Sequence, residues 1–313
     1  MGLMGEALAS QLKKIGKMKA LREQIQSCRG VGVDPQGIKT TQELIDQGLD
    51  PLHAAYASVQ HLISTFSEQI SALPQFKAYY DIVAFAEEEY MPSGPPMSPL
   101  TGSYFTCWAF FDVRFGPDQE TIGTCLLDAA TALNLSPDVE TILESMQNSR
   151  LGVYEHLGLH AGRVLLEDIV TKDKFTCYVP AGYWGEKGQC WIVRLLPSIQ
   201  DLFDYSLVFN TPYVWQGSST HDWEAFFKRT LLGTNEENAT YPHFMKYGTD
   251  VHYWSEYIFQ AYHHHQKDAI FLEGLPDVRD SLPHGSARKP VPIQSIQRNR
   301  NRQLKAKKNK RAR

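Results

Sequence analysis

Long hydrophobic runs are missing from this sequence, and so are the common signatures of nucleotide binding and hydrolysis. No stretch of about 18 apolar residues occurs, which excludes a membrane-spanning helix. The patterns G-x-x-x-x-G-K-[ST], G-x-G-x-x-G and G-x-S-x-G are also missing, which excludes the usual phosphate-binding loops and the nucleophile elbow of hydrolases. The sequence therefore predicts no cofactor and gives no recognisable catalytic residue.

Cysteine is scarce, and its number is odd. No two cysteines form a C-x-x-C pair, which argues against a disulfide framework and against a structural zinc site. Cys125 falls on the apolar stripe of an expected helix, and Cys177 alternates with Phe175 and Val179 in an expected strand, so both are predicted to lie in the core. We expect a reducing, cytoplasmic compartment. The five cysteines are Cys28, Cys107, Cys125, Cys177 and Cys190.

Acidic and aromatic residues are both missing from the C-terminal segment 281–313, which contains eleven Lys or Arg residues. The remaining positions, 1–280, hold 20 basic and 35 acidic residues, so the body carries a charge of −15 and the tail +11. A block of like charges repels itself and buries too little apolar surface to offset its ordering entropy. The tail is therefore expected to be disordered in isolation.

The end of this tail is the strongest functional signal in the sequence. Nine cations within sixteen residues favour contact with the phosphates of RNA or DNA, without sequence reading and with strong salt dependence. Because the tail holds no aromatic residue, it cannot stack on bases. A solubilising tail, or one that folds back on the acidic body, is the main alternative; an anionic membrane is disfavoured because no apolar anchor is present. The predicted nucleic-acid-binding residues are Arg298, Arg300, Arg302, Lys305, Lys307, Lys308, Lys310, Arg311 and Arg313.

The N-terminal 90 residues read as a helical unit. Residues 5–28 predict a basic helix, the capping-box pair Thr40 and Glu43 opens a short one, and Asp50 with Pro51 opens a longer one. Over 52–73 the apolar residues are spaced 4-3-4-3-4-3, as in a coiled-coil seam. The seam requires a partner, which is residues 5–28, residues 76–90, or a second copy of the chain in a homo-oligomer.

A connection rich in proline and glycine, residues 91–102, separates this unit from the rest of the chain. An apolar aromatic run at 104–112 follows and is predicted to be buried. Helices are expected at 118–134 and 137–148, then at 219–232 and 241–265. Between them the period changes to that of short strands joined by turns, which predicts an antiparallel meander or a small barrel, with Pro212 demoting or splitting the last strand. The strands are expected at Gly152–Leu157, Arg163–Val170, Lys174–Val179, Gln189–Leu196 and Tyr205–Trp215.

Candidate sites within this unit are weaker. His252, Glu256 and His263 share a face of the helix expected at 241–265, but that face is opposite the apolar one, so no metal site is predicted. Cys107 lacks an activating neighbour, and its aromatic surroundings should raise the pKa of its thiol. The candidate ligand surface consists of Tyr183, Trp184, His221 and Asp222, and Tyr213 with Trp215 either extends an aromatic face at a barrel mouth or closes the core.

The segments Ser149–Glu155, Leu165–Asp168 and Trp191–Pro197, together with residues 91–101, resemble a β-rich region in a family of bacterial proteins for which no activity is known. The resemblance covers roughly positions 90–230. It implies a bacterial cytoplasmic origin and no catalytic residue.

The sequence thus predicts an α+β protein with a helical unit at 1–90, an α+β unit at 103–275 with strands at about 150–215, and a disordered basic tail at 281–313. The function predicted first is that of a non-enzymatic interaction protein whose tail contacts nucleic acid or ribonucleoprotein. One alternative is an enzyme with a site between the proline-rich connection and the β unit. Another is a structural protein that self-associates through the helix at 52–73.

Overall fold

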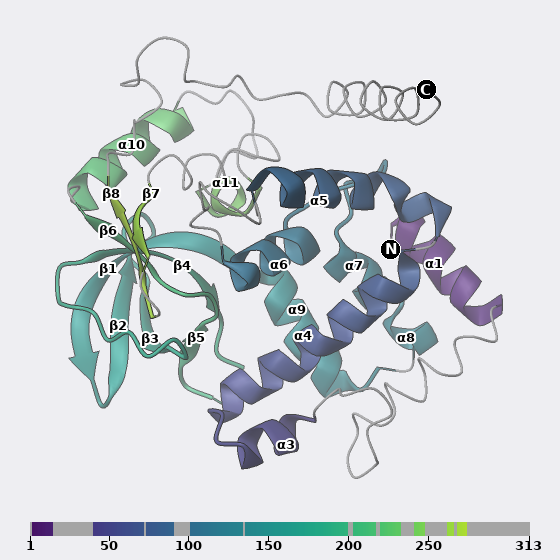
Figure 1. Cartoon of the computed structure of the whole chain (residues 1–313), viewed down its shortest axis with the longest axis horizontal. Helices are drawn as coiled ribbons and strands as arrows, with labels where there is room; N and C mark the ends of the chain where they lie inside the picture. Colours follow the sequence, from purple (N-terminus) through teal and green to yellow (C-terminus); the bar gives the residue numbers. More distant parts are fainter. Residues whose placement is uncertain are drawn as a thin grey trace, which may run out of the picture.

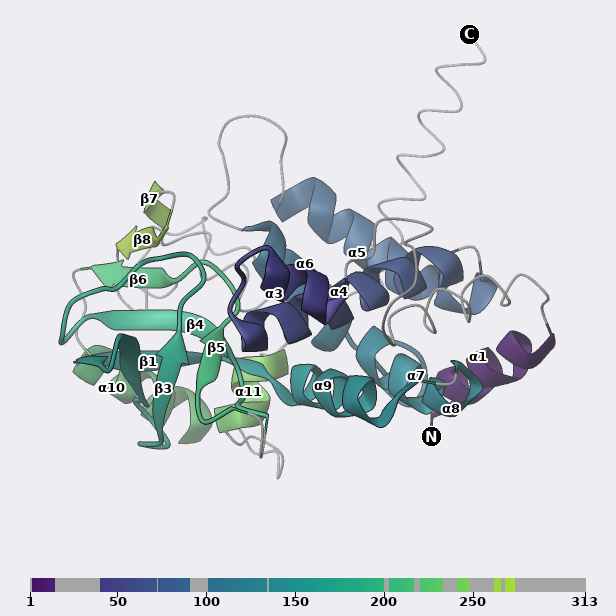
Figure 2. The same ribbon diagram turned by 90° about the horizontal axis from the view of Figure 1, so that it is seen from below.

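The fold is α+β, as the sequence predicts, with N-terminal helices and a central five-stranded mixed β-barrel flanked by helices. Figures 1 and 2 show the helices of residues 3–148 (α1 and α3 to α9) on one side of the molecule, and the barrel with α10 (Thr220–Leu232) on the other. This computed structural model describes residues 2–14, 40–71, 73–90, 101–133, 135–199, 203–216, 220–232, 241–247, 262–265 and 268–273. The basic tail, 281–313, lies outside the described residues.

Capping residues define where the N-terminal helices begin. Thr40 and Glu43 form the predicted capping box at the start of α3, and the carboxylate of Asp50 accepts from two backbone N–H groups at the start of α4. Of the basic helix expected at 5–28, only the part in α1 belongs to the described residues. The helices up to the barrel are α1 (Leu3–Lys14), α3 (Thr41–Asp46), α4 (Pro51–Ile70), the short 3-10 helix η1 (Pro74–Phe76), α5 (Lys77–Tyr90), α6 (Gly102–Phe111), α7 (Ile122–Asp128), α8 (Ala130–Leu133) and α9 (Pro137–Asn148).

The heptad seam of α4 is buried within the same chain. Its apolar residues are at most 3 % exposed and belong to one core with α6, α7 and α9. The partner of the seam is thus mainly α7 and α9, neither of which was named from the sequence. Self-association through this seam would require the core of the helical unit to open. The seam residues are Leu52, Tyr56, Val59, Ile63, Phe66 and Ile70.

The aromatic run after the proline-rich connection forms α6, and most of its side chains are buried, as predicted. Residues 91–100 of the connection lie outside the described part of the chain. The core shared by α4 and α5 with α6, α7 and α9 runs across this connection, so the helices on its two sides pack as one body. The division into units at 91–102 stays a prediction about the sequence.

The barrel consists of five strands in the order β1-β2-β3-β5-β4, and it is closed by a second pairing between β1 and β4. Four of the pairings in this ring are antiparallel, and β3 with β5 is parallel, so the small barrel that was predicted is mixed. Its strands are β1 (Arg150–His160), β2 (Arg163–Asp168), β3 (Lys174–Tyr178), β4 (Cys190–Leu196) and β5 (Ser206–Val208). Closure leaves few free strand edges.

The sheet continues beyond the barrel from β4. β6 (Tyr213–Gln216) pairs antiparallel with β4, β8 (Ile270–Glu273) pairs parallel with β6, and β7 (Tyr262–His265) forms the last strand. The run predicted as one strand at 205–215 is split into β5 and β6, with Pro212 in the connection. Two helices, α10 (Thr220–Leu232) and α11 (Tyr241–Tyr247), cover the outer face of this sheet.

The helix expected at 241–265 is wrong at its C-terminal end. The described helix α11 covers Tyr241–Tyr247, and residues 262–265 form the strand β7, which is paired with β8. Backbone hydrogen bonds to β8 here override a local helical periodicity, since β8 is itself fixed by β6. His263 therefore does not lie on a helical face; His252 and Glu256 lie outside the described residues.

Candidate functional site

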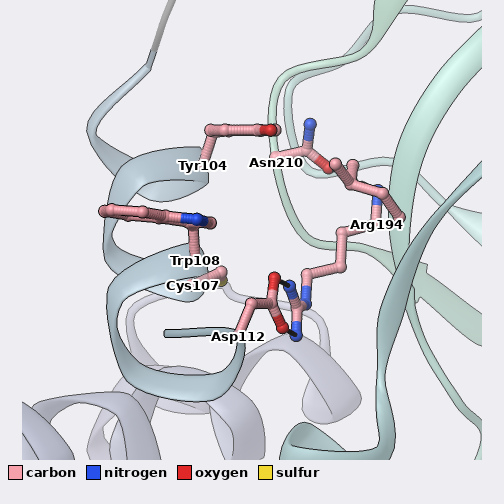
Figure 3. Close-up of a pocket in the computed structure, with 7 residues that line it drawn as sticks. Tyr104, Cys107, Trp108, Asp112, Arg194 and Asn210 are labelled. Atoms are coloured by element: carbon pink, nitrogen blue, oxygen red, sulfur yellow. Dashed lines mark hydrogen bonds and ion pairs between the residues drawn. The ribbon is translucent and has the colours of Figure 1, made fainter. Parts of the chain in front are cut away.

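A buried ion cluster joins three helices to the barrel. Arg194, from the middle of β4, is 3 % exposed and forms two parallel hydrogen bonds with Asp112, from Nη1 to Oδ2 at 2.7 Å and from Nη2 to Oδ1 at 3.1 Å. Figure 3 shows the guanidinium of Arg194 pointing across the gap between the barrel and α6 to the carboxylate of Asp112. The Nε group donates to Ser149 Oγ at 2.9 Å. This bidentate geometry is the strongest form of an arginine–carboxylate pair.

The alternation of β4 explains why an arginine lies in a strand that is buried throughout. Trp191, Val193 and Leu195 point into the barrel, whereas Cys190, Ile192 and Arg194 point outward to the helices. Along one edge of β4, Leu195 and Leu196 pair with β5, whereas Cys190 to Ile192 pair with β6. Arg194 lies where the partner strand changes, and the loop between β5 and β6 bonds its backbone. There the side chain of Asn210 accepts the backbone N–H of Arg194 at 2.8 Å.

Lys246, on α11, completes the cluster. Its Nζ lies 3.2 Å from Asp112 Oδ1, donates to the carbonyl of Ser149 at 2.8 Å, and also donates to the carbonyl of Gln147. These carbonyls end α9, where the helix dipole favours cations. Burial lowers the pKa of Lys246 to about 8; Asp112 opposes this shift and Arg194 adds to it. Two cations thus share one carboxylate, and the helix-end carbonyls supply the remaining acceptors.

A small cavity lies beside the cluster, between α6 and the barrel. Asp112 and Arg194 form one side of it, and the space is enough for about one water molecule. Burial raises the pKa of the Cys107 thiol to about 12, in the direction predicted from its aromatic surroundings, so it is protonated at neutral pH. The other lining residues are Tyr104, Cys107, Trp108, Leu151 and Asn210.

This cavity lies where a site was predicted for the enzyme alternative, between the proline-rich connection and the β unit, since α6 follows that connection. It does not contain the residues that were named for that site, and a space of about one water holds no substrate. The cluster holds α6, α9 and α11 against β4, with its charged atoms bound to protein partners. The arrangement can fix the helices on the barrel, and we assign it that structural role.

The predicted ligand surface is divided between two ends of the barrel. Tyr183 lies in the β3–β4 connection and packs on Trp191, whereas His221 and Asp222 lie at the start of α10. Glu224 of α10 bonds Lys172 in the β2–β3 turn, at 2.5 Å. Because β2 and β3 are antiparallel, this turn and the β3–β4 connection are at opposite ends of β3. The structure therefore does not bring the tyrosine and Trp184 together with His221 and Asp222.

The remaining predicted residues fall into two groups. Tyr213 and Trp215 are at most 4 % exposed and close the core on the side of α10, which is the second of the two interpretations that the sequence left open. Cys125 and Cys177 are buried core residues, as predicted. The tail residues from Arg298 to Arg313 lie outside the described residues. In the part of the chain that the structure describes, no three His, Cys, Asp or Glu side chains are grouped as a metal site.

The ion cluster was missed by sequence reasoning. A single arginine inside the apolar run 190–196 is a signal, because an arginine is almost never fully buried without a partner. The partner could not be found in this way, since Asp112 is 82 positions away and no local pattern links it to β4. Sequence periodicity identifies the element that carries a charge, and only the fold identifies its counterion.

Comparison with known proteins gives no relative: no family model, curated protein or solved structure matches the chain. The resemblance to a bacterial family with a β-rich region therefore stays a prediction. Of the described helices, none combines the length and the apolar composition needed to cross a bilayer.

Proposed function

We propose that this protein binds the phosphate backbone of nucleic acid, free or in a ribonucleoprotein, through the basic segment 281–313, and that the folded body carries this segment. The observation that carries the proposal is the segregation of charge along the chain. The segment has eleven basic residues and no acidic one, whereas positions 1–280 have a net charge of −15. Each phosphate that a cation contacts releases counterions, which favours binding of a polyanion.

The acidity of the body is concentrated in the helical part. Residues 40–149, which include α3 to α9, contain 15 acidic and 2 basic residues, a net charge of −13. Residues 150–216, which form the barrel and β6, contain 7 acidic and 6 basic residues, a net charge of −1. A polyanion is repelled by residues 40–149 and attracted most strongly by the basic segment, at +11; residues 1–39, with 7 basic and 3 acidic residues, carry only +4.

The helical part also competes for the basic segment. Its carboxylates are spread over the surfaces of several helices, whereas a DNA duplex carries one charge per about 1.7 Å of its axis and releases condensed counterions on binding. At low salt the polyanion should therefore displace contacts between the segment and the body. The alternative is that the segment binds the acidic body instead of nucleic acid, and the experiment below must distinguish the two.

The connectivity of the barrel gives secondary support. Five strands closed in the order β1-β2-β3-β5-β4, with β3 and β5 parallel, share their connectivity with the OB-fold, a small barrel that in other proteins binds oligonucleotides or oligosaccharides. Since a fold alone does not determine function, the charge distribution carries the proposal. The four described cysteines are free buried thiols, which supports a reducing compartment such as the cytoplasm.

The experiment compares the full chain with a variant that lacks residues 285–313, on labelled duplex DNA and on RNA over a series of salt concentrations. If all nine cations of 298–313 contact phosphates, the slope of log K against log salt on the duplex reaches about −8. Replacing Lys305, Lys307 and Lys308 by Gln should make the slope shallower by about 3, whereas Lys77→Gln, on the acidic helical part, should leave it unchanged. Equal affinity of the full and shortened chains at low salt would contradict the proposal.

A further inference from the structure

One end of the barrel exposes a large aromatic side chain. Trp184, in the connection between β3 and β4, is 51 % exposed, and Leu159, at the end of β1, is 57 % exposed. The antiparallel pairings of β1 with β2 and of β2 with β3 place the β1–β2 turn and the β3–β4 connection at the same end of the barrel. We call Leu159, His160, Trp184 and Lys187 the barrel-end patch; all four are exposed.

The backbone that carries Trp184 is fixed by buried groups. Its carbonyl lies 2.8 Å from Nε2 of His156, a side chain in the barrel interior that is 1 % exposed. The backbone N–H of Gly158 donates to His156 Nδ1 at 3.1 Å, so Nδ1 is the acceptor and Nε2 carries the proton that is donated to the Trp184 carbonyl. The imidazole packs on the indole of Trp191, with the ring centroids 5.1 Å apart.

The next residue, Gly185, restricts the backbone conformation of the same turn. Its φ of +63° is in the left-handed region, and a Cβ atom built there would lie 2.4 Å from the ring of Trp191. On the other side of Trp184, the ring of Tyr183 packs on Trp191 and its hydroxyl bonds Gln189. Tyr183 and Gly185, on the two sides of Trp184, are thus half-buried against Trp191, whereas the indole of Trp184 is 51 % exposed. Such an indole is preorganised for stacking, because little main-chain entropy remains to be lost.

Charge decides which ligand fits this surface. A polyanion held by the segment 281–313 is repelled by the helical part, at −13, and meets little repulsion at the barrel, at −1. The segment lacks an aromatic residue and can engage only phosphates, whereas the barrel-end patch offers the exposed ring of Trp184, in a connection where the charges of Glu186 and Lys187 cancel. Recognition of a single strand needs both phosphate contact, which the segment can supply, and base stacking, which the patch can supply.

We propose that the barrel-end patch binds single-stranded nucleic acid by stacking an unpaired base on Trp184. The inference rests on the proposed function and adds its substrate class, since the bases of a duplex are paired and cannot reach the indole. Stacking on an aromatic side chain contributes about 1–3 kcal/mol per base, which corresponds to a 5- to 150-fold change in affinity.

The test uses the full chain, fluorescence anisotropy, and two probes: a thymidine oligonucleotide of about 15 nucleotides and a duplex of the same length. Trp184→Ala should weaken binding of the single strand by about 5- to 150-fold and leave duplex binding unchanged. Trp184→Phe should restore most of the loss, because an aromatic face is retained. Leu3→Ala removes a side chain that is 58 % exposed on α1 and should change neither affinity.

Salt dependence separates stacking from a change of charge. Trp184→Ala should lower the affinity for the single strand at every salt concentration without altering the slope of log K against log salt, because no cation is removed. Equal loss on both probes, or no loss on either, would overturn the inference; the latter is also the result expected if the patch binds a protein. Failure of the proposed function has a different signature, in which deletion of 285–313 leaves the affinity for both probes unchanged.

Discussion

Replacing Asp112 by Asn tests the buried ion cluster, because it removes the negative charge and keeps the shape. The carboxylate is 6 % exposed and faces two cations, Arg194 at 3 % and Lys246 at 10 %. Both cations would remain buried with no counterion, and breaking a buried pair in this way destabilises a protein by about 3–5 kcal/mol. We expect Asp112→Asn to lower the free energy of unfolding by that amount.

Urea denaturation followed by far-UV circular dichroism measures this change. The matched control is Asp81→Asn, which breaks a pair of similar length with Lys77 on a helix surface, 2.8 Å against 2.7 Å for Asp112 with Arg194. That loss should be at most about 0.5 kcal/mol. Adding Lys246→Met to Asp112→Asn should recover part of the loss, since one uncompensated cation is removed. A loss below about 1 kcal/mol for Asp112→Asn would refute the reasoning.

Three further predictions follow from the same structure. The pKa of Lys246 is about 8 in the folded chain and 10.5 in the unfolded one, so this lysine binds more protons in the unfolded chain between these values, and its contribution to stability should rise with pH above about 8. The buried thiols act in the opposite direction over the same range, so the test is the difference in the free energy of unfolding between the wild type and Lys246→Met; it should shift in favour of the wild type by about 1 kcal/mol from pH 8 to 9, and a constant difference would contradict the prediction. In a Cys28→Ser background, Ellman's reagent at pH 8 should modify Cys107 only as fast as the chain unfolds, because burial raises the pKa of that thiol to about 12; fast labelling of folded protein would show the burial to be wrong. Gly185→Ala should destabilise by about 1–3 kcal/mol more than Gly188→Ala, because a Cβ at Gly185 meets Trp191 whereas one at Gly188 meets nothing within 4 Å; equal losses in thermal unfolding would count against the fixed turn.

Local chemistry allowed much of the fold to be predicted from the sequence. The caps at Thr40 and Asp50, the start of α9 at Pro137, and the separation of β5 from β6 around Pro212 all depend on residues within a few positions of each other. Such signals hold because a cap or a proline acts on its own backbone. The burial of the aromatic run at 104–112 follows from its apolar composition, whereas its helical conformation as α6 was not predicted.

Contacts between distant segments could not be predicted. The strand β7 forms where the sequence indicates a helix, since its backbone is paired with β8. The parallel pairing of β3 with β5 joins Cys177 to Ser206, and no local pattern encodes it. The candidate ligand surface is divided for the same reason: the fold places Trp184 at one end of the barrel and His221 at the other. The sequence places Trp184 in a turn between two strands and His221 at the start of a helix, as in the structure, but the distance between them depends on topology.

The salt dependence of nucleic-acid binding tests the central claim most directly. The binding constant of the full chain for duplex DNA, measured at several salt concentrations beside that of the chain lacking residues 285–313, gives the number of phosphates engaged by the basic segment. If the basic segment holds the nucleic acid, the full chain has a steep negative slope, and the shortened chain has a shallow slope and much weaker binding. Two identical slopes would contradict the central claim.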